Sequence, residues 1–306
     1  MEPVLRFISD LLAFFSIYMI LSLSLNLEFG FTGIPNFGKV LFSAGGAFVV
    51  GSVLIRLVAL LAHVPYANLA IESARVSGEA TKYLASNPLL AIGLFLGLLL
   101  LSAVVGGILG YLASYPAIRL REDYLAISLL AAGEFVRIVM RNYEPVVGGT
   151  LGVSVPELFS WVPGAFTREL LRISSMLLIA VVMWLAVERL TNSPLGRLLR
   201  AVRENEIAAA SLGKDVSSLR MRTLIVGSSI AAIAGALYAM YTGYVNADDY
   251  SPLRTFVVWV MVMLGGAGNN LGSILGAFIY LIIEKTVTFS KGFLKLPFDV
   301  NFVAYI

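Results

Sequence analysis

Long apolar stretches constrain the fold of this chain more than any other feature. Several runs of roughly 20 apolar residues follow one another, and each is long enough to cross a bilayer core as a helix. Only 13% of the 306 residues are charged and 58% are hydrophobic, whereas a soluble domain carries about twice that charged fraction. We therefore predict an all-α, multi-pass bundle of transmembrane helices that forms a single domain over residues 1–306.

The apolar runs and the turn residues between them give the expected elements. The more polar stretch 63–87 has charges at three- and four-residue steps, which predicts a surface helix outside the bilayer. Small residues four apart predict close helix packing, as at Gly93 and Gly97, Gly106 and Gly110, and Gly227 to Ala239. The expected spans are 11–27, 40–61, 88–113, 124–140, 170–190 and 223–243, followed by two shorter pieces, 253–264 and 271–284.

Glycine-rich interruptions occur in both halves of the chain, at 28–39 and at 265–270. Interrupted helices at membrane depth are tolerated where they are buried in protein or line a cavity, and such pairs point to a transport path. An ordinary loop followed by an ordinary helix explains the first interruption equally well. The candidate path residues are Gly33, Asn36, Gly38, Glu134, Gly265, Gly266, Gly268 and Asn269.

Glu134 is a candidate for a different reason, because a charge inside a span is costly and is a functional hypothesis by default. Arg137 lies three residues further on, so the two side chains can pair on one helix face. We favour this structural pairing and keep the functional interpretation open.

The stretch 193–213 is polar and basic, unlike its surroundings. Ser193 is expected to cap a helix that begins at Pro194, and Gly213 is expected to end it in a left-handed conformation. One apolar stripe contains Leu195, Leu198, Leu199 and Val202. The sequence thus predicts a short amphipathic helix that presents charge to something outside the bilayer.

Charge also orients the chain. Six basic residues lie between 194 and 222, which marks that loop as cytoplasmic, whereas Asp248 and Asp249 follow Gly243 on the outer side. Alternating sides then place 63–87 outside, and the N-terminus also outside unless the segment 31–51 re-enters the membrane from the side on which it starts. The glycine-containing segment 142–168 is also outside, where it either receives a substrate-delivering protein or serves as a flexible linker.

Several chemistries are excluded by residue type. The chain has no cysteine and one histidine, His63, so we expect neither thiolate chemistry nor a metal site. The run Gly33 to Val40 nearly spells a phosphate-binding loop, but Val40 has no hydroxyl for magnesium. We expect the chain to bind no ATP itself.

The run SPLGRLLRAVRENEIAAASLGKDV resembles the cytoplasmic loop of branched-chain amino acid ABC transporter permeases, in particular the M-type subunit of leucine/isoleucine/valine uptake systems. In that family the loop helix docks into a cleft on the ATP-binding subunit. The resemblance continues over 26–284 and includes Gly133 to Arg137. The residues it implies for coupling are Pro194, Gly196, Arg197, Arg200, Arg203, Glu204 and Gly213.

The resemblance implies a multi-pass protein of the cell membrane that is a transport subunit and not an enzyme. The implied partners are the lipid bilayer, a second permease, two ATP-binding subunits that carry ATP and Mg²⁺, and an external solute-binding protein, with no nucleic acid. The implied cargo is a branched-chain or related amino acid. Alternatives are a permease for sugars or nucleosides, an ion-coupled secondary transporter that uses Glu134, and, least favoured, an intramembrane enzyme.

Overall fold

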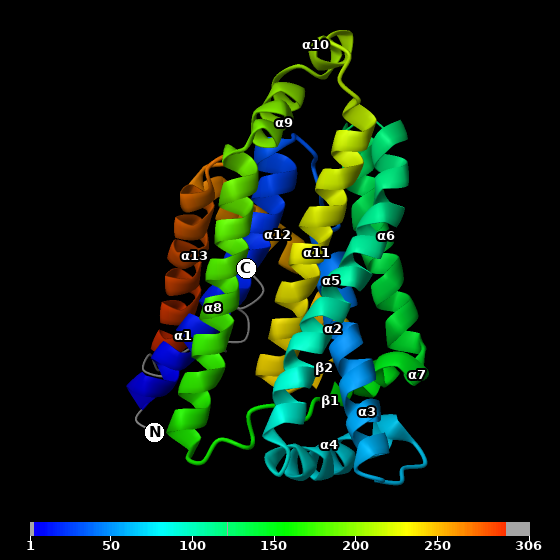
Figure 1. Cartoon of the computed structure of the whole chain (residues 1–306), viewed down its shortest axis with the longest axis vertical. Coiled ribbons are helices and arrows are strands. Elements are labelled where there is room, and N and C mark those ends of the chain that lie inside the picture. Colours follow the sequence, from blue (N-terminus) through cyan, green and yellow to red (C-terminus); the bar gives the residue numbers. More distant parts are fainter. Residues whose placement is uncertain (1–2, 121, 292–306) are drawn as a thin grey trace.

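Long helices lie side by side along the molecule and form one bundle (Figure 1). The structure is a computed structural model that describes residues 3–120 and 122–291, so Arg121 and the C-terminal residues from Gly292 lie outside it. The predicted all-α membrane fold is confirmed. The elements are α1 (Pro3–Leu25), η1 (Asn26–Phe31), α2 (Lys39–Val49), η2 (Val50–Leu54), α3 (Ile55–Leu61), α4 (Leu69–Ala85), α5 (Pro88–Arg119), α6 (Glu122–Asn142), α7 (Glu144–Val147), η3 (Gly149–Leu151), β1 (Val153–Ser154), α8 (Ala165–Asn192), α9 (Pro194–Glu204), α10 (Glu206–Ser211), α11 (Val216–Thr242), β2 (Tyr244–Val245), η4 (Ala247–Tyr250), α12 (Pro252–Gly265) and α13 (Asn270–Lys291).

The two ends of the bundle carry different elements. α9 and α10 project at one end, whereas α4, α7, the paired strands and the N-terminal end lie at the other (Figure 1). The basic residues of the α9 to α11 region identify the first end as cytoplasmic. The predicted outer positions of the 63–87 helix and the N-terminus agree with this arrangement.

Six helices in the described ranges are long and apolar enough to cross a membrane. α6 also runs along the bundle beside α5, although its charges keep it out of that set (Figure 1). The expected span 40–61 is confirmed, because η2 is a π-helical turn that joins α2 to α3 in one helical stretch, Lys39–Leu61. One detail of the prediction is wrong. The second short piece is a full span, since α13 continues past Glu284 to Lys291.

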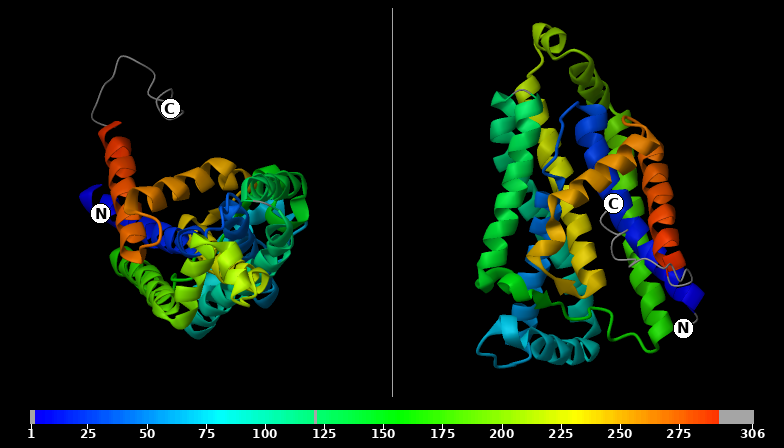
Figure 2. Two further views of the ribbon diagram at one scale, coloured as in Figure 1. Left: turned by 90° about the horizontal axis from the view of Figure 1, so that it is seen from above. Right: turned by 180° about the vertical axis from the view of Figure 1, so that it is seen from behind.

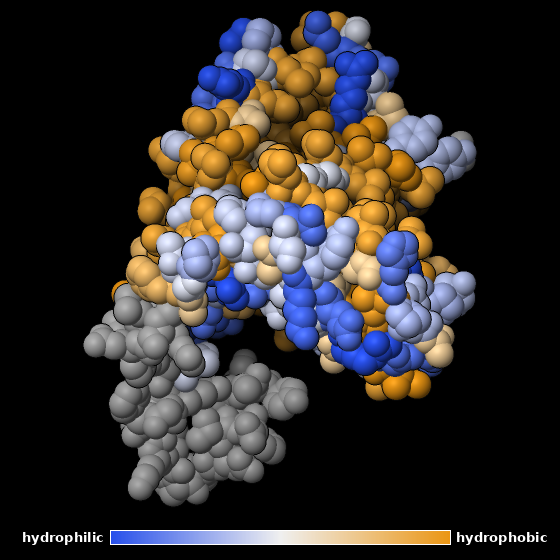
Figure 3. All heavy atoms as spheres, turned by 60° about the horizontal axis from the view of Figure 1, so that its bottom comes forward, coloured by the Kyte–Doolittle hydropathy of each residue, from blue (hydrophilic) through white to orange (hydrophobic). Residues whose placement is uncertain are grey.

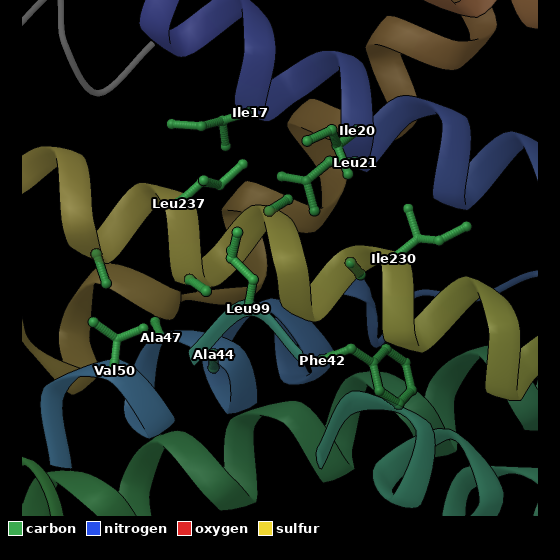
Figure 4. Packing of buried hydrophobic residues seen from close by; sticks show 14 of the residues in the cluster. Ile17, Ile20, Leu21, Phe42, Ala44, Ala47, Val50, Leu99, Ile230 and Leu237 are labelled. Atoms are coloured by element: carbon green, nitrogen blue, oxygen red, sulfur yellow. The ribbon is translucent and has the colours of Figure 1, made fainter. Parts of the chain in front are cut away.

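The core forms where α11 packs against α1, α2 and α5 (Figure 4). Glycines allow the backbones to approach, because a Cβ at Gly46 would overlap the carbonyl of Ala232, and one at Gly235 would overlap that of Ser43. Gly106 likewise faces the α11 backbone, as its spacing predicts. At Gly93 and Gly97 an added Cβ would meet no other described atom within 4 Å, so these two glycines make no close helix contact within the described part of this chain.

α12 crosses the back of the bundle at a slant, and α13 returns beside α1 (Figure 2).

The elements at the outer end pack against one another. Segment 142–168 is held in place, because β1 pairs with β2 and the backbone N–H of Glu157 donates to the Thr81 hydroxyl of α4 at 3.0 Å. Polar side chains gather on this end and apolar ones on the flanks (Figure 3).

Candidate coupling helix and buried polar elbow

The start of α9 is formed as the sequence predicts, with one correction. Pro194 occupies the first turn, where its missing N–H leaves no unpaired donor. Ser193 stands at the N-cap, but its hydroxyl donates back to the carbonyl of Leu190 at 2.6 Å and makes no cap bond. The turn between α8 and α9 is tight, since a Cβ at Gly196 would overlap the Thr191 carbonyl oxygen. α9 is therefore attached to the end of α8 through a backbone contact that requires glycine.

The predicted single helix from 193 to 213 is in fact two helices. Asn205 adopts an extended conformation that ends α9, and its side chain caps α10 by accepting from the N–H of Ala208 at 2.9 Å. An asparagine at this position competes with helix continuation, since its side chain satisfies the next turn's free donor. Gly213 ends the hairpin with φ +74°, as predicted.

The apolar stripe of α9 is only partly buried. Leu199 and Val202 are buried against the bundle, whereas Leu195 is exposed. At the tip, Ile207 and Leu212 are 79% and 78% exposed.

The charged residues of α9 divide into two groups. Arg200 donates to the Thr191 carbonyl at 3.1 Å and lies over the Phe31 ring, and Arg203 donates to the carbonyl of Gly30. Arg197 and Glu204 are exposed, and within the described residues their side chains form no hydrogen bond or ion pair. Of the four charged residues predicted for coupling, Arg200 and Arg203 thus bind the bundle itself, and Arg197 and Glu204 face outward.

Arg203 lies where the two glycine-rich interruptions meet. Its guanidinium would be 2.8 Å from a Cβ at Gly268, and its side chain would be 3.1 Å from one at Gly33. A Cβ at Gly30 would overlap the backbone nitrogen of Gly268. The sequence identified both interruptions, and the structure adds that they lie in backbone contact under α9.

Side-chain amides join these interruptions. Asn26 accepts from the N–H of Gly268 at 2.8 Å and donates to Asn270 at 2.9 Å. Asn270 in turn donates to Glu188 and Thr191 of α8, both at 2.8 Å. We call this set, Asn26, Glu188, Thr191, Gly268 and Asn270, the polar elbow. It connects η1, α8 and α13 directly beneath α9.

A buried ion pair lies next to the polar elbow. The Lys39 ammonium is 2.6 Å from Oε2 of Glu28, and the two side chains are 1% and 0% exposed. Asn36 donates to the same oxygen at 2.8 Å. The other oxygen, Oε1, has no hydrogen-bond partner in the described part of the chain and faces Gly227, where a Cβ would overlap it.

The sequence analysis did not predict the ion pair between Glu28 and Lys39. Two opposite charges on either side of an interruption in apolar sequence could have indicated it. Their pairing depends on the turn between them, which returns the chain over 11 residues. Burial removes the hydration of both ions, and only one carboxylate oxygen of Glu28 has hydrogen-bond partners among the described residues, so each charge depends strongly on the other.

The remaining candidate path residues have structural positions. Gly33 and Gly266 have positive φ, and a Cβ at Gly38 would be 2.7 Å from the Leu129 carbonyl. Gly265 packs on the Gly272 backbone, and the Asn269 side chain accepts from the Gly272 N–H at 3.2 Å. Gly268 is itself part of the polar elbow, Asn36 donates to Glu28 of the ion pair, and Gly38 packs against α6.

Glu134 lies apart from the others. It accepts from Arg137 at 2.9 Å, and Arg137 also pairs with Asp248 of η4 at the outer end. The favoured structural pairing is therefore present. No group of three or more His, Cys, Asp or Glu side chains that could hold a metal ion is found within residues 3–120 and 122–291.

Comparisons with known proteins identify the family to which the chain is similar. Residues 7–297 match the family described as the permease component of branched-chain amino acid transport systems. A protein of Methanocaldococcus jannaschii named "Probable branched-chain amino acid transport permease protein LivM" is 38% identical, over 98% of this chain and 88% of its own length. The high-affinity branched-chain amino acid permease LivM of Salmonella typhimurium is 29% identical over 90% of this chain, which spans 62% of that relative's length. The LivH permease of the same organism is 26% identical over 88% of this chain. No solved structure matches the chain significantly.

Proposed function

Because the chain belongs to the family of permease components of branched-chain amino acid transport systems, we propose that it is one permease subunit of an ATP-driven importer for such amino acids. In this proposal residues 1–306 form one permease domain in the cell membrane. The chain binds no ATP or Mg²⁺, which are held by two partner ATP-binding subunits. A second permease chain and an external solute-binding protein complete the transporter.

The observation that carries the proposal is the projecting pair α9 and α10 (Figure 1). Its outward surface combines the charges of Arg197 and Glu204 with the exposed apolar tip residues Ile207 and Leu212. Apolar anchors with a charged rim are typical of protein interfaces. We assign this surface to the ATP-binding subunit.

Movement of the docked ATP-binding subunit can reach the bundle through the contacts that α9 makes with it. α9 is fixed to α8 by the contact at Gly196 and by Arg200, and Arg203 holds the carbonyl of Gly30. ATP can bias alternating access only by interacting differently with the two states of the permease. We propose that α9 transmits this difference to the polar elbow.

The exposed apolar flanks of α5 and α8, including Leu100 and Leu178, suit contact with lipid or the second permease. The outer layer around α4 suits the solute-binding protein. The ion-coupled alternative is weakened, because Glu134 is bound to Arg137 and not free near the middle of the bundle.

Purification of the tagged chain from its native membrane in mild detergent, with mass spectrometry of its companions, tests the proposal. We expect an ATP-binding subunit and a second permease. An Arg197→Glu/Glu204→Lys variant should lose the ATP-binding subunit and keep the second permease. Lys82→Glu, on α4 at the opposite end, is the matched control and should keep both. A homo-oligomer without any ATP-binding subunit would overturn the proposal.

A further inference from the structure

A narrow cavity lies between α1, α2, α11 and α12, separate from the polar elbow. Its middle is apolar and is lined by Ile17, Leu21, Val40 and Val258. Its inner end reaches Lys39, whose charge is already neutralised by Glu28. In this conformation it has room for little more than a water molecule, so the surrounding helices are closed around it.

The outer end of this cavity contains a cation with spare donors. Arg254 of α12 lines it and donates one hydrogen bond, at 2.8 Å, to the Tyr238 hydroxyl. No other side-chain hydrogen bond of Arg254 is found in the described ranges. Its acidic neighbour Asp249 is 3.8 Å away, which is beyond hydrogen-bond distance. The guanidinium also lies over the rings of Tyr238 and Tyr250, at 4.5 and 5.9 Å from their centroids, so its charge is partly compensated while several of its N–H donors have no hydrogen-bond acceptor among the described side chains.

Tyr250 of η4 gives an independent indication of a ligand at the same end. The residue lines the cavity and is 3% exposed, yet its hydroxyl has no hydrogen-bond partner among the described residues. Burial raises the pKa of Tyr250 well above its usual range, so the hydroxyl keeps its proton and can donate. Native proteins rarely leave such a group unpaired, because the lost hydration is not recovered.

We propose that this cavity binds the cargo inside the permease, with the carboxylate of an aliphatic α-amino acid held by Arg254 and Tyr250. A guanidinium matches the two oxygens of a carboxylate, and the tyrosine hydroxyl supplies a further donor. In this assignment the cargo's ammonium group pairs with Asp249, whose carboxylate is 3.8 Å from the Arg254 guanidinium. The aliphatic side chain then lies along the apolar middle of the cavity.

This assignment rests on the proposed function and requires the cavity to open. α12 supplies both Arg254 and Val258 and is joined to α13 through the glycine-rich turn at Gly266. A shift of α12 away from α1 and α11 would widen the cavity. Binding and opening are therefore coupled to the interruption that lies beneath Arg203.

The test uses the assembled transporter without its solute-binding protein and measures equilibrium binding of radiolabelled L-leucine by scintillation proximity. We expect saturable binding that L-valine displaces and leucinamide, which lacks the carboxylate, does not. Tyr250→Phe should raise Kd about 10-fold and Arg254→Met about 100-fold, as for hydrogen bonds to charged groups. Tyr244→Phe, which removes a hydroxyl outside the cavity, is the control and should leave Kd unchanged.

Tyr250→Phe separates binding from folding. The hydroxyl has no partner in the described structure, so its removal should leave thermal stability equal or higher. Equal Kd values for wild type, Tyr250→Phe and Arg254→Met would overturn the inference, as would displacement by leucinamide or an absence of saturable binding. ATP-driven leucine uptake, measured on the same preparation with the solute-binding protein restored, distinguishes the two levels. Uptake without this pattern of binding would overturn the assignment of the cargo site but not the proposed function. Absence of uptake would overturn both.

Discussion

The buried Glu28–Lys39 pair allows a stability prediction with a definite sign for each variant. Both side chains are essentially inaccessible, and their charged atoms are 2.6 Å apart. Removal of one charge leaves the other buried and uncompensated, which costs about 3–5 kcal/mol. For a chain of this size we expect Glu28→Gln and Lys39→Met each to lower the unfolding midpoint by about 6–20 °C.

The loss of stability in the double variant should be smaller than the sum of the losses in the two single variants. Replacement of a buried pair by neutral side chains of similar volume is often neutral or stabilising. Glu28→Gln/Lys39→Met should therefore recover most of the lost stability, with a coupling free energy of about 3 kcal/mol or more. Thermal unfolding of the detergent-solubilised transporter, followed by size-exclusion chromatography with fluorescence detection, measures all four forms.

The exposed pair Glu72–Arg75 on α4 is the matched control, and Glu72→Gln should give no measurable shift of the midpoint. Additive losses in the double variant, or single variants with midpoints equal to that of wild type, would refute the reasoning. Either result would mean that water or protonation compensates the remaining charge.

Three further predictions concern α9 and the structure beneath it. Gly196→Ala should lower stability by about 1–3 kcal/mol, because the added methyl group overlaps the Thr191 carbonyl, and thermal unfolding measures this loss. Asn26→Ala should cost about 1–3 kcal/mol, since it leaves buried partners unpaired, and equal midpoints for variant and wild type would contradict the bond network. Arg203→Met should keep the ATP-binding subunit in co-purification and lower transport per ATP hydrolysed. Arg197→Met should reduce co-purification itself, and the opposite pattern would reverse the two assignments.

Much of the architecture could be predicted because membrane spans depend on local composition. Runs of apolar residues, the proline at 194 and the glycine at 213 have the expected roles. The break at Asn205 was missed, because the helical pattern continues across it and only the side-chain cap shows that the helix restarts. The cap hydrogen bond predicted for Ser193 is absent, because its hydroxyl donates instead to the Leu190 carbonyl in the preceding turn.

The candidate site was predicted less completely, because its contacts join distant segments. Asn26 and Asn270 are 244 positions apart, and nothing in either local sequence indicates the other. Arg200 and Arg203 were expected to contact a partner, but the structure shows both bound to the bundle. Glycine spacing predicted that the interruptions matter, and three-dimensional packing was needed to show that they touch.

The glycine contacts between α2 and α11 restrict how the bundle can move. Gly46 of α2 lies against the Ala232 carbonyl of α11, and Gly235 of α11 lies against the Ser43 carbonyl of α2. Each helix therefore contacts the backbone of the other at a glycine. A shift of α2 along the axis of α11 would replace the glycine at each contact by a residue with a side chain, which would clash with the carbonyl group. The pair can still tilt as a single unit, and α12 and α13 are among the elements that lie outside this interlock and can move relative to it.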